Sequence, residues 1–274
     1  MTPLTSTEDL AARLDEPDLR IVDGSWHLDG RDARADFERA HIPGAVFFDL
    51  DAVSDRDNPL PHMLPSPDAF AASVGALGIA ADDQIVVYDT TGLFSAARVW
   101  WMLKTMGAAN VQILDGGLPR WLGYRHPVVA GPSASVATLF CPTAKIEAVA
   151  SLADVRAALK QDIQVVDARG APRFNGTAAE PRPGVRSGHM PGALNLPYGR
   201  LLNEDGTMKR GTVLKQAFAD AGVDIDRPVI TTCGSGVTAA ILTLGLAELG
   251  RSSRLYDGSW SEWGAHIDTP VETD

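Results

Sequence analysis

The chain has 274 residues, a length that suits two domains with a hydrophobic core each. Its apolar content of 45% and charged content of 22% are ordinary for a globular protein. The formal net charge of −11 argues against a nucleic acid partner, because a phosphate-binding surface requires a basic face. A small anionic substrate, which needs only a few local arginines, is not excluded.

The first half of the chain alternates short apolar strands with helical stretches. Strands are predicted at residues 20–23, 45–48, 84–88 and 111–114, and a helix at 96–106. Residues 1–10 lack the basic region and apolar core of a secretory signal, and no run is long enough to span a bilayer. We therefore expect a cytoplasmic protein that makes no contact with a membrane.

A linker and a second alternating half follow. Gly, Pro, Ser, Ala and Thr gather near residues 131–148, where Cys141 is interpreted as an incidental thiol. Strands are predicted at 163–166, 193–196, 228–232 and 254–256, and a helix at 237–249. This order predicts an α/β fold with a mainly parallel sheet and helices on both faces in each half. The expected domains are residues 1–133 and 149–274, joined by a linker at 134–148.

Three motifs recur once, at a period near half the length of the chain. His-Ile-Pro-Gly-Ala at 41–45 returns as His-Met-Pro-Gly-Ala at 189–193, and residues 85–92 align with 229–236. Asp-Gly-Gly at 115–117 returns as Asp-Gly-Ser at 257–259, each followed by a tryptophan at the same spacing. The agreement predicts two homologous domains. His41 and His189, each before Pro-Gly at a turn, are interpreted as structural.

One cysteine lies where a predicted strand meets a predicted helix. Cys233 follows the strand directly, and glycines stand at 234 and 236. Such a loop directs backbone N–H groups and the positive end of the helix dipole at its contents, which favours a thiolate. We predict a reactive thiolate here rather than a buried core cysteine. The aligned residue in the first half is Asp89, so only the second half has a nucleophile.

These features resemble the two-domain rhodanese-type sulfurtransferases, over essentially the whole chain. The loop from Cys233 to Thr238 is similar to that of the 3-mercaptopyruvate sulfurtransferases, whereas thiosulfate sulfurtransferases typically carry basic residues just after the cysteine. The resemblance implies tandem rhodanese-like domains with a catalytically silent first copy. It also implies that sulfur passes from 3-mercaptopyruvate through a persulfide on Cys233, and that pyruvate is released. Loop residues that would bind the substrate or the persulfide are Gly234, Gly236, Val237 and Thr238.

Residues outside the loop complete the implied site. By resemblance, Arg173 and Arg182 bind the carboxylate and ketone oxygens, which suit forked cations. The alternative is that one or both form surface ion pairs with Glu180 or a neighbour. The resemblance further implies a proton relay of Ser235, His62 and Asp51, although His62 alone would be interpreted as a structural histidine. Arg186 is interpreted as structural.

The expected partners are small. Sulfur would pass to thioredoxin, a small dithiol or cyanide; no metal or organic cofactor is expected, and a monomer would suffice. One alternative is thiosulfate:cyanide sulfur transfer by the same fold. A cysteine phosphatase is disfavoured, since Ala239 stands where such a loop requires arginine. A non-catalytic binding or redox-sensing module is the third alternative, because Asp89 indicates that the fold tolerates loss of the thiol.

Overall fold

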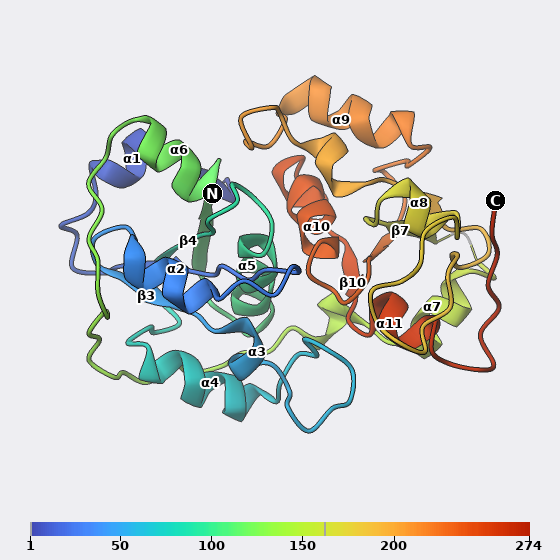
Figure 1. Ribbon diagram of the computed structural model, residues 1–274, viewed down its shortest axis with the longest axis horizontal. Coiled ribbons are helices and arrows are strands. Elements are labelled where there is room, and N and C mark those ends of the chain that lie inside the picture. Colours follow the sequence, from blue (N-terminus) through green and yellow to red (C-terminus); the bar gives the residue numbers. More distant parts are fainter. Residues whose placement is uncertain (1, 162) are drawn as a thin grey trace. The chain divides into compact units, whose positions relative to one another are not determined.

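The computed structural model describes residues 2–161 and 163–274, which form two compact units (Figure 1). The first unit comprises the chain up to Arg56 together with Leu64–Lys145 and Glu204–Met208. The second comprises Asp57–Met63, Ile146–Asn203 and Lys209–Asp274. In the described part of the chain, no helix has both the length and the apolar character needed to cross a membrane.

The first unit is built on a five-stranded parallel sheet with strand order β1-β5-β4-β2-β3. Its strands are β1 (Leu4–Thr5), β2 (Leu19–Asp23), β3 (Ala45–Phe47), β4 (Gln84–Tyr88) and β5 (Asn110–Leu114). Its helices are α1 (Thr7–Ala11), α2 (Ala33–Arg39), α3 (Leu50–Val53), α4 (Pro67–Ala76), α5 (Ala96–Thr105) and α6 (Gly117–Gly123).

The second unit repeats this topology with strand order β6-β10-β9-β7-β8, again all parallel. Its strands are β6 (Val149–Ala150), β7 (Gln164–Asp167), β8 (Leu194–Asn195), β9 (Val229–Thr232) and β10 (Arg254–Tyr256). Its α-helices are α7 (Leu152–Ala158), α8 (Ala171–Phe174), α9 (Gly211–Asp220), α10 (Ala239–Glu248) and α11 (Ser259–Trp263). Two 3₁₀ turns, η1 (Ile146–Ala148) and η2 (Tyr198–Leu201), complete it. The matching strand orders confirm the predicted duplication.

The predicted strands are all present, with some ends shifted, but two were missed. Both are two-residue edge strands, β1 and β6, one in each unit. The helix predicted from residue 237 begins instead at Ala239, because Val237 and Thr238 belong to the loop after β9. The strand predicted at 193–196 is shortened to β8, and that predicted at 163–166 lies at Gln164–Asp167.

The elements on either side of the Cys233 loop, β9 and α10, are buried in the second unit. All four residues of β9 are buried, so both faces of this central strand are covered, as a parallel sheet requires. Helix α10 is buried continuously from Ala239 to Leu246, an apolar surround that suits a helix inside the fold. The loop between β9 and α10 is therefore anchored at both ends in the core.

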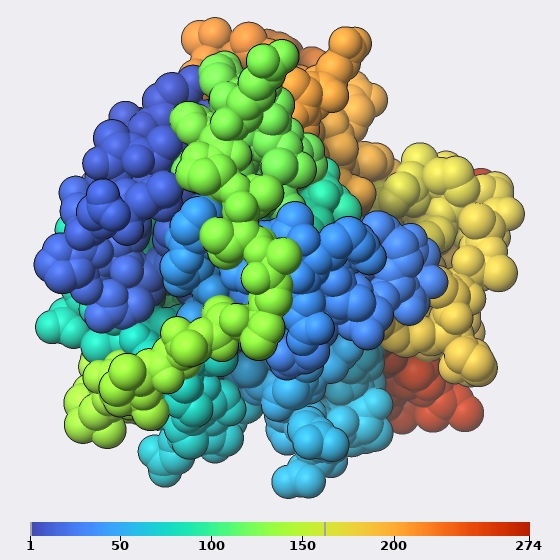
Figure 2. Space-filling view, turned by 60° about the vertical axis from the view of Figure 1, so that its left-hand side comes forward, coloured from blue at the N-terminus to red at the C-terminus, as the bar shows by residue number. Residues whose placement is uncertain are grey.

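The segment after α6 runs over the surface of the first unit, as Figure 2 shows in green. Thr138 N donates a hydrogen bond to the carbonyl of Gly75 in α4, and the Ser135 hydroxyl donates to the carbonyl of Ala76. Val136 is 90% exposed. Cys141, in the same segment, is also exposed.

A buried carboxyl at the end of β2 makes the stability of the first unit depend on pH. Burial raises the pKa of Asp23 to about 6, although hydrogen bonds from Ser25 act in the opposite direction. The folded state then holds this proton more tightly than the unfolded chain, so the free energy of unfolding falls as pH rises from about 4 to about 6 and stays lower above.

Asp23→Asn is expected to remove this dependence, because the amide does not ionise. Relative to the wild type, the variant should gain roughly 1–3 kcal/mol of unfolding free energy between about pH 4 and about pH 7. Denaturant titrations at both values measure the difference. An identical pH dependence in the two proteins would contradict the assignment.

Candidate active site

The second unit places Cys233 in the loop between β9 and α10, where the sequence predicts it. The residue is only 2% exposed, so its thiol lies inside the loop rather than on the surface. Helix α10 begins at Ala239, six residues after Cys233 in the sequence. The loop residues are buried except for Gly234 and Thr238, which are half-buried.

A second segment, Ser259–Ser261 at the start of α11, fixes the backbone of this loop. The N–H of Trp260 donates to the Cys233 carbonyl at 2.9 Å, and the N–H of Cys233 donates to the Ser259 hydroxyl at 3.3 Å. The Gly234 carbonyl accepts from both the N–H and the hydroxyl of Ser261, at 2.9 and 2.6 Å. Sequence reasoning missed this segment as part of the site, although Ser259 belongs to a recurring motif.

Ser235 is the polar centre of the loop. Its hydroxyl lies 3.0 Å from His62 Nδ1, and Arg182 Nη2 donates to the same hydroxyl at 3.4 Å. Ser235 and His62 are both buried. His62 comes from the segment Asp57–Met63 that packs with the second unit, and it adopts a left-handed backbone with φ 60°. Left-handed backbone at a bulky residue is uncommon and costs conformational energy.

Asp51 belongs to the first unit, on α3, and is exposed. Its Oδ2 accepts a hydrogen bond from Trp26 Nε1 at 3.1 Å. Of the four residues predicted to act in catalysis, the second unit thus brings together Cys233, Ser235 and His62. The membership of Asp51 in a relay stays a prediction.

A buried chain of charges leads from β7 to the cysteine loop. Arg169 bonds both carboxylate oxygens of Asp167 and donates through Nη1 to Glu180 at 2.9 Å. Glu180 in turn accepts two hydrogen bonds from Arg173, at 3.0 and 2.5 Å. Burial disfavours the charged guanidinium, but the neighbouring carboxylates outweigh it and raise the pKa of Arg169 above its ordinary value.

Arg173 therefore forms the ion pair with Glu180 that the sequence left open as an alternative to substrate binding. The same guanidinium also lies against the loop, because a Cβ added at Gly234 would come within 2.9 Å of Arg173 Nη2. Its side chain remains 25% exposed, so the ion pair does not bury it completely. The ion pair with Glu180 thus coexists with the approach of Arg173 to Gly234, and substrate binding by Arg173 stays a prediction.

Arg186, His41 and His189, which the sequence analysis interprets as structural, all bond backbone carbonyls. Arg186 donates to the carbonyls of Gly264, Trp263, His266 and Thr269 and so ties down the chain after α11. His41 and His189 occupy equivalent places in the two units: each bonds a carbonyl through Nδ1, of Phe37 and Phe174 respectively, and stacks on the same ring.

The aligned loop of the first unit is filled by the carboxylate of Asp89. Its Oδ1 accepts from the N–H and the hydroxyl of Thr91, both at 2.9 Å. Its Oδ2 accepts from the N–H of Phe94 at 2.7 Å and of Ala96 at 2.9 Å. A loop of this form thus directs its amides at a negative group, as expected for a turn at a helix N-terminus.

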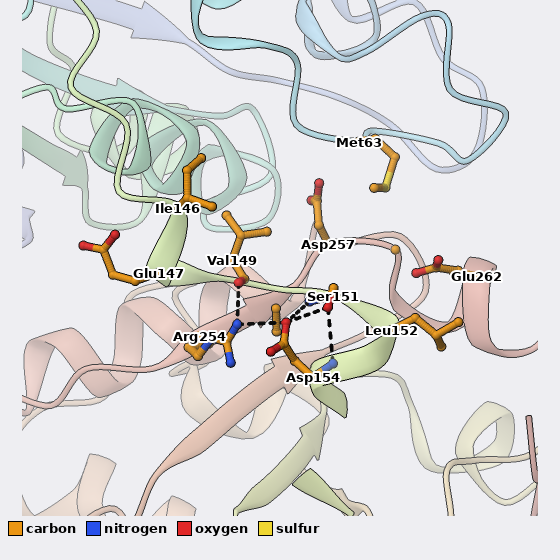
Figure 3. A pocket seen from close by; sticks show the side chains of 12 residues that line it. Met63, Ile146, Glu147, Val149, Ser151, Leu152, Asp154, Arg254, Asp257 and Glu262 are labelled. Carbon is orange, nitrogen blue, oxygen red and sulfur yellow. Dashed lines mark hydrogen bonds and ion pairs between the residues drawn. The ribbon is translucent and has the colours of Figure 1, made fainter. Parts of the chain in front are cut away.

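A pocket of about 500 Å³ lies beside β6 and β10 in the second unit (Figure 3). Its acidic lining residues are Glu147, Asp154, Asp257 and Glu262. Arg254, the one basic side chain among the described residues that line the pocket, is bound to Asp154 and to the Val149 carbonyl. Hydrogen bonds from Ser151, and then Arg254, lower the pKa of Asp154 to about 2. So acidic a pocket is unsuited to an anionic substrate.

Comparison with known proteins decides the family. The model of the rhodanese-like domain matches this chain twice, at residues 6–124 and 151–266. The chain belongs to the rhodanese family. Both the family and the tandem arrangement predicted from the sequence are confirmed. Among the described residues of this rhodanese-family protein, no group of three or more His, Cys, Asp or Glu side chains could hold a metal ion.

Similar proteins extend along the whole rhodanese-family chain. The 3-mercaptopyruvate sulfurtransferase of Escherichia coli is 46% identical over 96% of this chain and 95% of its own length. Thiosulfate/3-mercaptopyruvate sulfurtransferase 1, mitochondrial, of Arabidopsis thaliana is 41% identical over 99% of this chain and 78% of its own. The crystal structure of SseA from Escherichia coli, described as a 3-mercaptopyruvate sulfotransferase, matches with a TM-score of 0.88 and 41% identity over 95% of this chain and 99% of that one.

Proposed function

We propose that this rhodanese-family protein is an enzyme that transfers sulfur from 3-mercaptopyruvate to a thiol acceptor or to cyanide and releases pyruvate. The observation that carries the proposal is the grouping of side chains around one loop. Cys233 is buried in the loop that leads into α10, and Arg173 lies against the adjacent Gly234. The similarity to two enzymes whose names include 3-mercaptopyruvate supports the choice of substrate.

In the first step, the Cys233 thiolate attacks the sulfur of 3-mercaptopyruvate. A sulfur–sulfur bond forms, the carbon–sulfur bond breaks, and its electron pair leaves as the enolate of pyruvate. Arg173 and Arg182 would bind the carboxylate and ketone oxygens, where negative charge grows as the enolate forms. The persulfide on Cys233 would be stabilised by the amides of Gly234, Gly236, Val237 and Thr238.

The enolate must then gain a proton on its terminal carbon. Ser235 and His62, 3.0 Å apart, would pass this proton, which the substrate thiol released. Asp51 is proposed to end the relay by orienting His62. Arg182, within 3.4 Å of the Ser235 hydroxyl, would join the relay to the bound ketone oxygen.

In the second step, an acceptor thiolate attacks the outer sulfur, and the Cys233 thiolate leaves. Reduced thioredoxin or a small dithiol would take the sulfur and release it as sulfide on forming its own disulfide; cyanide would give thiocyanate. We propose that the enzyme acts as a monomer in the cytoplasm. Domain boundaries at residues 1–133 and 149–274, with a linker at 134–148, are part of the same proposal.

The proposal is tested by steady-state assays of the wild type with 3-mercaptopyruvate and with thiosulfate, each with a dithiol acceptor. We expect kcat/KM for 3-mercaptopyruvate to exceed that for thiosulfate by at least about tenfold, because Gly234 and Ser235 add no cation for a sulfonate-like donor. Mass spectrometry after donor alone should find one added sulfur atom on the Cys233 peptide.

Thiosulfate:cyanide sulfur transfer is the second candidate. The Arabidopsis thaliana relative, whose match covers 99% of this chain, carries both thiosulfate and 3-mercaptopyruvate in its name, and this supports the second candidate. Preference for thiosulfate would replace the first proposal by the second. Turnover of neither donor would leave a non-catalytic binding or redox-sensing module.

A further inference from the structure

We propose that Ser261 is a positioning residue, which holds the Gly234–Ser235 peptide so that Ser235 meets its partners and the loop amides face the sulfur. The inference rests on the proposed function for its catalytic readout. Ser261 lies at the third position of α11, is 5% exposed, and touches the loop through two donors. Both donors converge on one acceptor, the Gly234 carbonyl.

The need for such a contact arises at Gly234. A side chain here would meet the guanidinium of Arg173, since even a Cβ would lie 2.9 Å from its Nη2. Glycine solves that conflict but leaves the backbone more conformational freedom than any other residue. The peptide that carries Ser235 would therefore move readily unless another group fixed it.

The two bonds from Ser261 fix this peptide in one direction. In a planar trans peptide, the carbonyl and the N–H of the next residue point to opposite sides. When Ser261 holds the Gly234 carbonyl, the N–H of Ser235 must point away from α11. The same peptide sets the position of the Ser235 Cα, and hence the contacts of its hydroxyl with His62 and Arg182.

The first unit provides an internal comparison. Its loop bond from Leu118 N to the Asp89 carbonyl, at 2.9 Å, matches that from Trp260 N to the Cys233 carbonyl. At the positions aligned with Gly234 and Ser261, however, it carries Thr90 and Pro119. Proline has no N–H and no hydroxyl to donate. The doubly held glycine therefore occurs in the copy that has the cysteine and not in the copy that lacks it.

Two substitutions separate the donors. Ser261→Ala removes the hydroxyl bond and keeps the N–H, whereas Ser261→Pro removes both. Proline fits this position, because Pro119 is the third residue of α6 and the N–H of Ser261 serves the loop rather than α11. We expect kcat for 3-mercaptopyruvate to fall about two- to tenfold in Ser261→Ala. In Ser261→Pro it should fall about ten- to a hundredfold, with KM changed less than about twofold.

A double-mutant cycle distinguishes positioning from general support of the fold. If Ser261 acts through Ser235, Ser261→Pro should lower kcat much less in a Ser235→Ala background than in the wild type. Ser253→Ala is the matched control: its hydroxyl bonds Thr243 at 3.2 Å in the same unit, and we expect wild-type kinetics. Equal effects of Ser261→Pro in both backgrounds, or wild-type kcat in both Ser261 variants, would overturn the inference.

A readout without substrate keeps this inference separate from the proposed function. The rate of alkylation of Cys233 by iodoacetamide should change several-fold in Ser261→Pro, because the peptide that follows the thiol is no longer held by two donors. Exposed Cys141 serves as the internal reference and should react at an unchanged rate. If the wild type failed to use 3-mercaptopyruvate while this difference persisted, the proposed function would fail and the inference would stand. Unchanged alkylation together with unchanged kcat would refute the inference alone.

Discussion

Cys233→Ser is expected to abolish sulfur transfer, with a loss in kcat/KM of at least about 10³-fold for any sulfur donor. A serine hydroxyl stays protonated near neutral pH and cannot form a persulfide. Cys233 is only 2% exposed, so a substitute must match its size. Serine is close in size to cysteine, and the fold should therefore persist. Release of pyruvate from 3-mercaptopyruvate, and the absence of added sulfur on the protein, are the measurements.

Cys141→Ser is the matched control for that substitution. Cys141 is exposed in the surface segment of the first unit, so its loss should leave turnover within about twofold of the wild type. The pair of variants tests the two thiols of the chain separately. Turnover retained in Cys233→Ser and lost in Cys141→Ser would reverse the assignment of the nucleophile.

Arg169→Met is expected to cost about 3–5 kcal/mol of unfolding free energy, the largest stability effect that we predict. Arg169 is buried, with its guanidinium 4.3 Å above the ring of Trp260. Its removal leaves the carboxylates of Asp167 and Glu180 buried without their shared cation. Denaturant titration followed by tryptophan fluorescence measures the loss, since Trp260 packs on this side chain.

Arg251→Met is the control for an exposed ion pair in the same unit. Arg251 bonds Asp226, but both side chains are largely exposed, and such pairs contribute under about 1 kcal/mol. Arg169→Met should also impair turnover, because Glu180 would then bind Arg173 alone. Equal stability losses in the two variants would refute the central place of Arg169 in the buried network.

The parts of the fold that were predictable are those with long patterns. The apolar run at β4 and the β-favouring residues of β9 predict buried strands directly, and the recurring motifs predict a second copy of the same sheet. The edge strands β1 and β6 were missed, because two residues are too few for any periodic signal. Their pairing with β5 and β10 is a tertiary property.

The site was predictable where chain neighbours define it and less so where distant segments meet. The strand, cysteine and glycines at 229–236 indicate the loop at once. By contrast, the sequence favoured substrate binding by Arg173 and left an ion pair with Glu180 as the alternative; formation of this ion pair depends on side-chain packing that the spacing does not reveal. Arg169 was not singled out at all. The sequence does contain a signal for it. Arg169 follows the end of β7 by two residues, and the aligned residue of the first unit is Ser25, so only the second copy has a cation at this place.

The carboxylate of Asp89 bears on how the two copies could diverge. A loop that directs buried N–H groups inward cannot simply lose its sulfur, because donors without an acceptor would weigh against folding. The Asp89 carboxylate accepts from three of these N–H groups, those of Thr91, Phe94 and Ala96, and from the Thr91 hydroxyl. A carboxylate at position 89 thus supplies, within the chain itself, the negative group that this loop is shaped to hold, so the first loop is stable without a bound ligand.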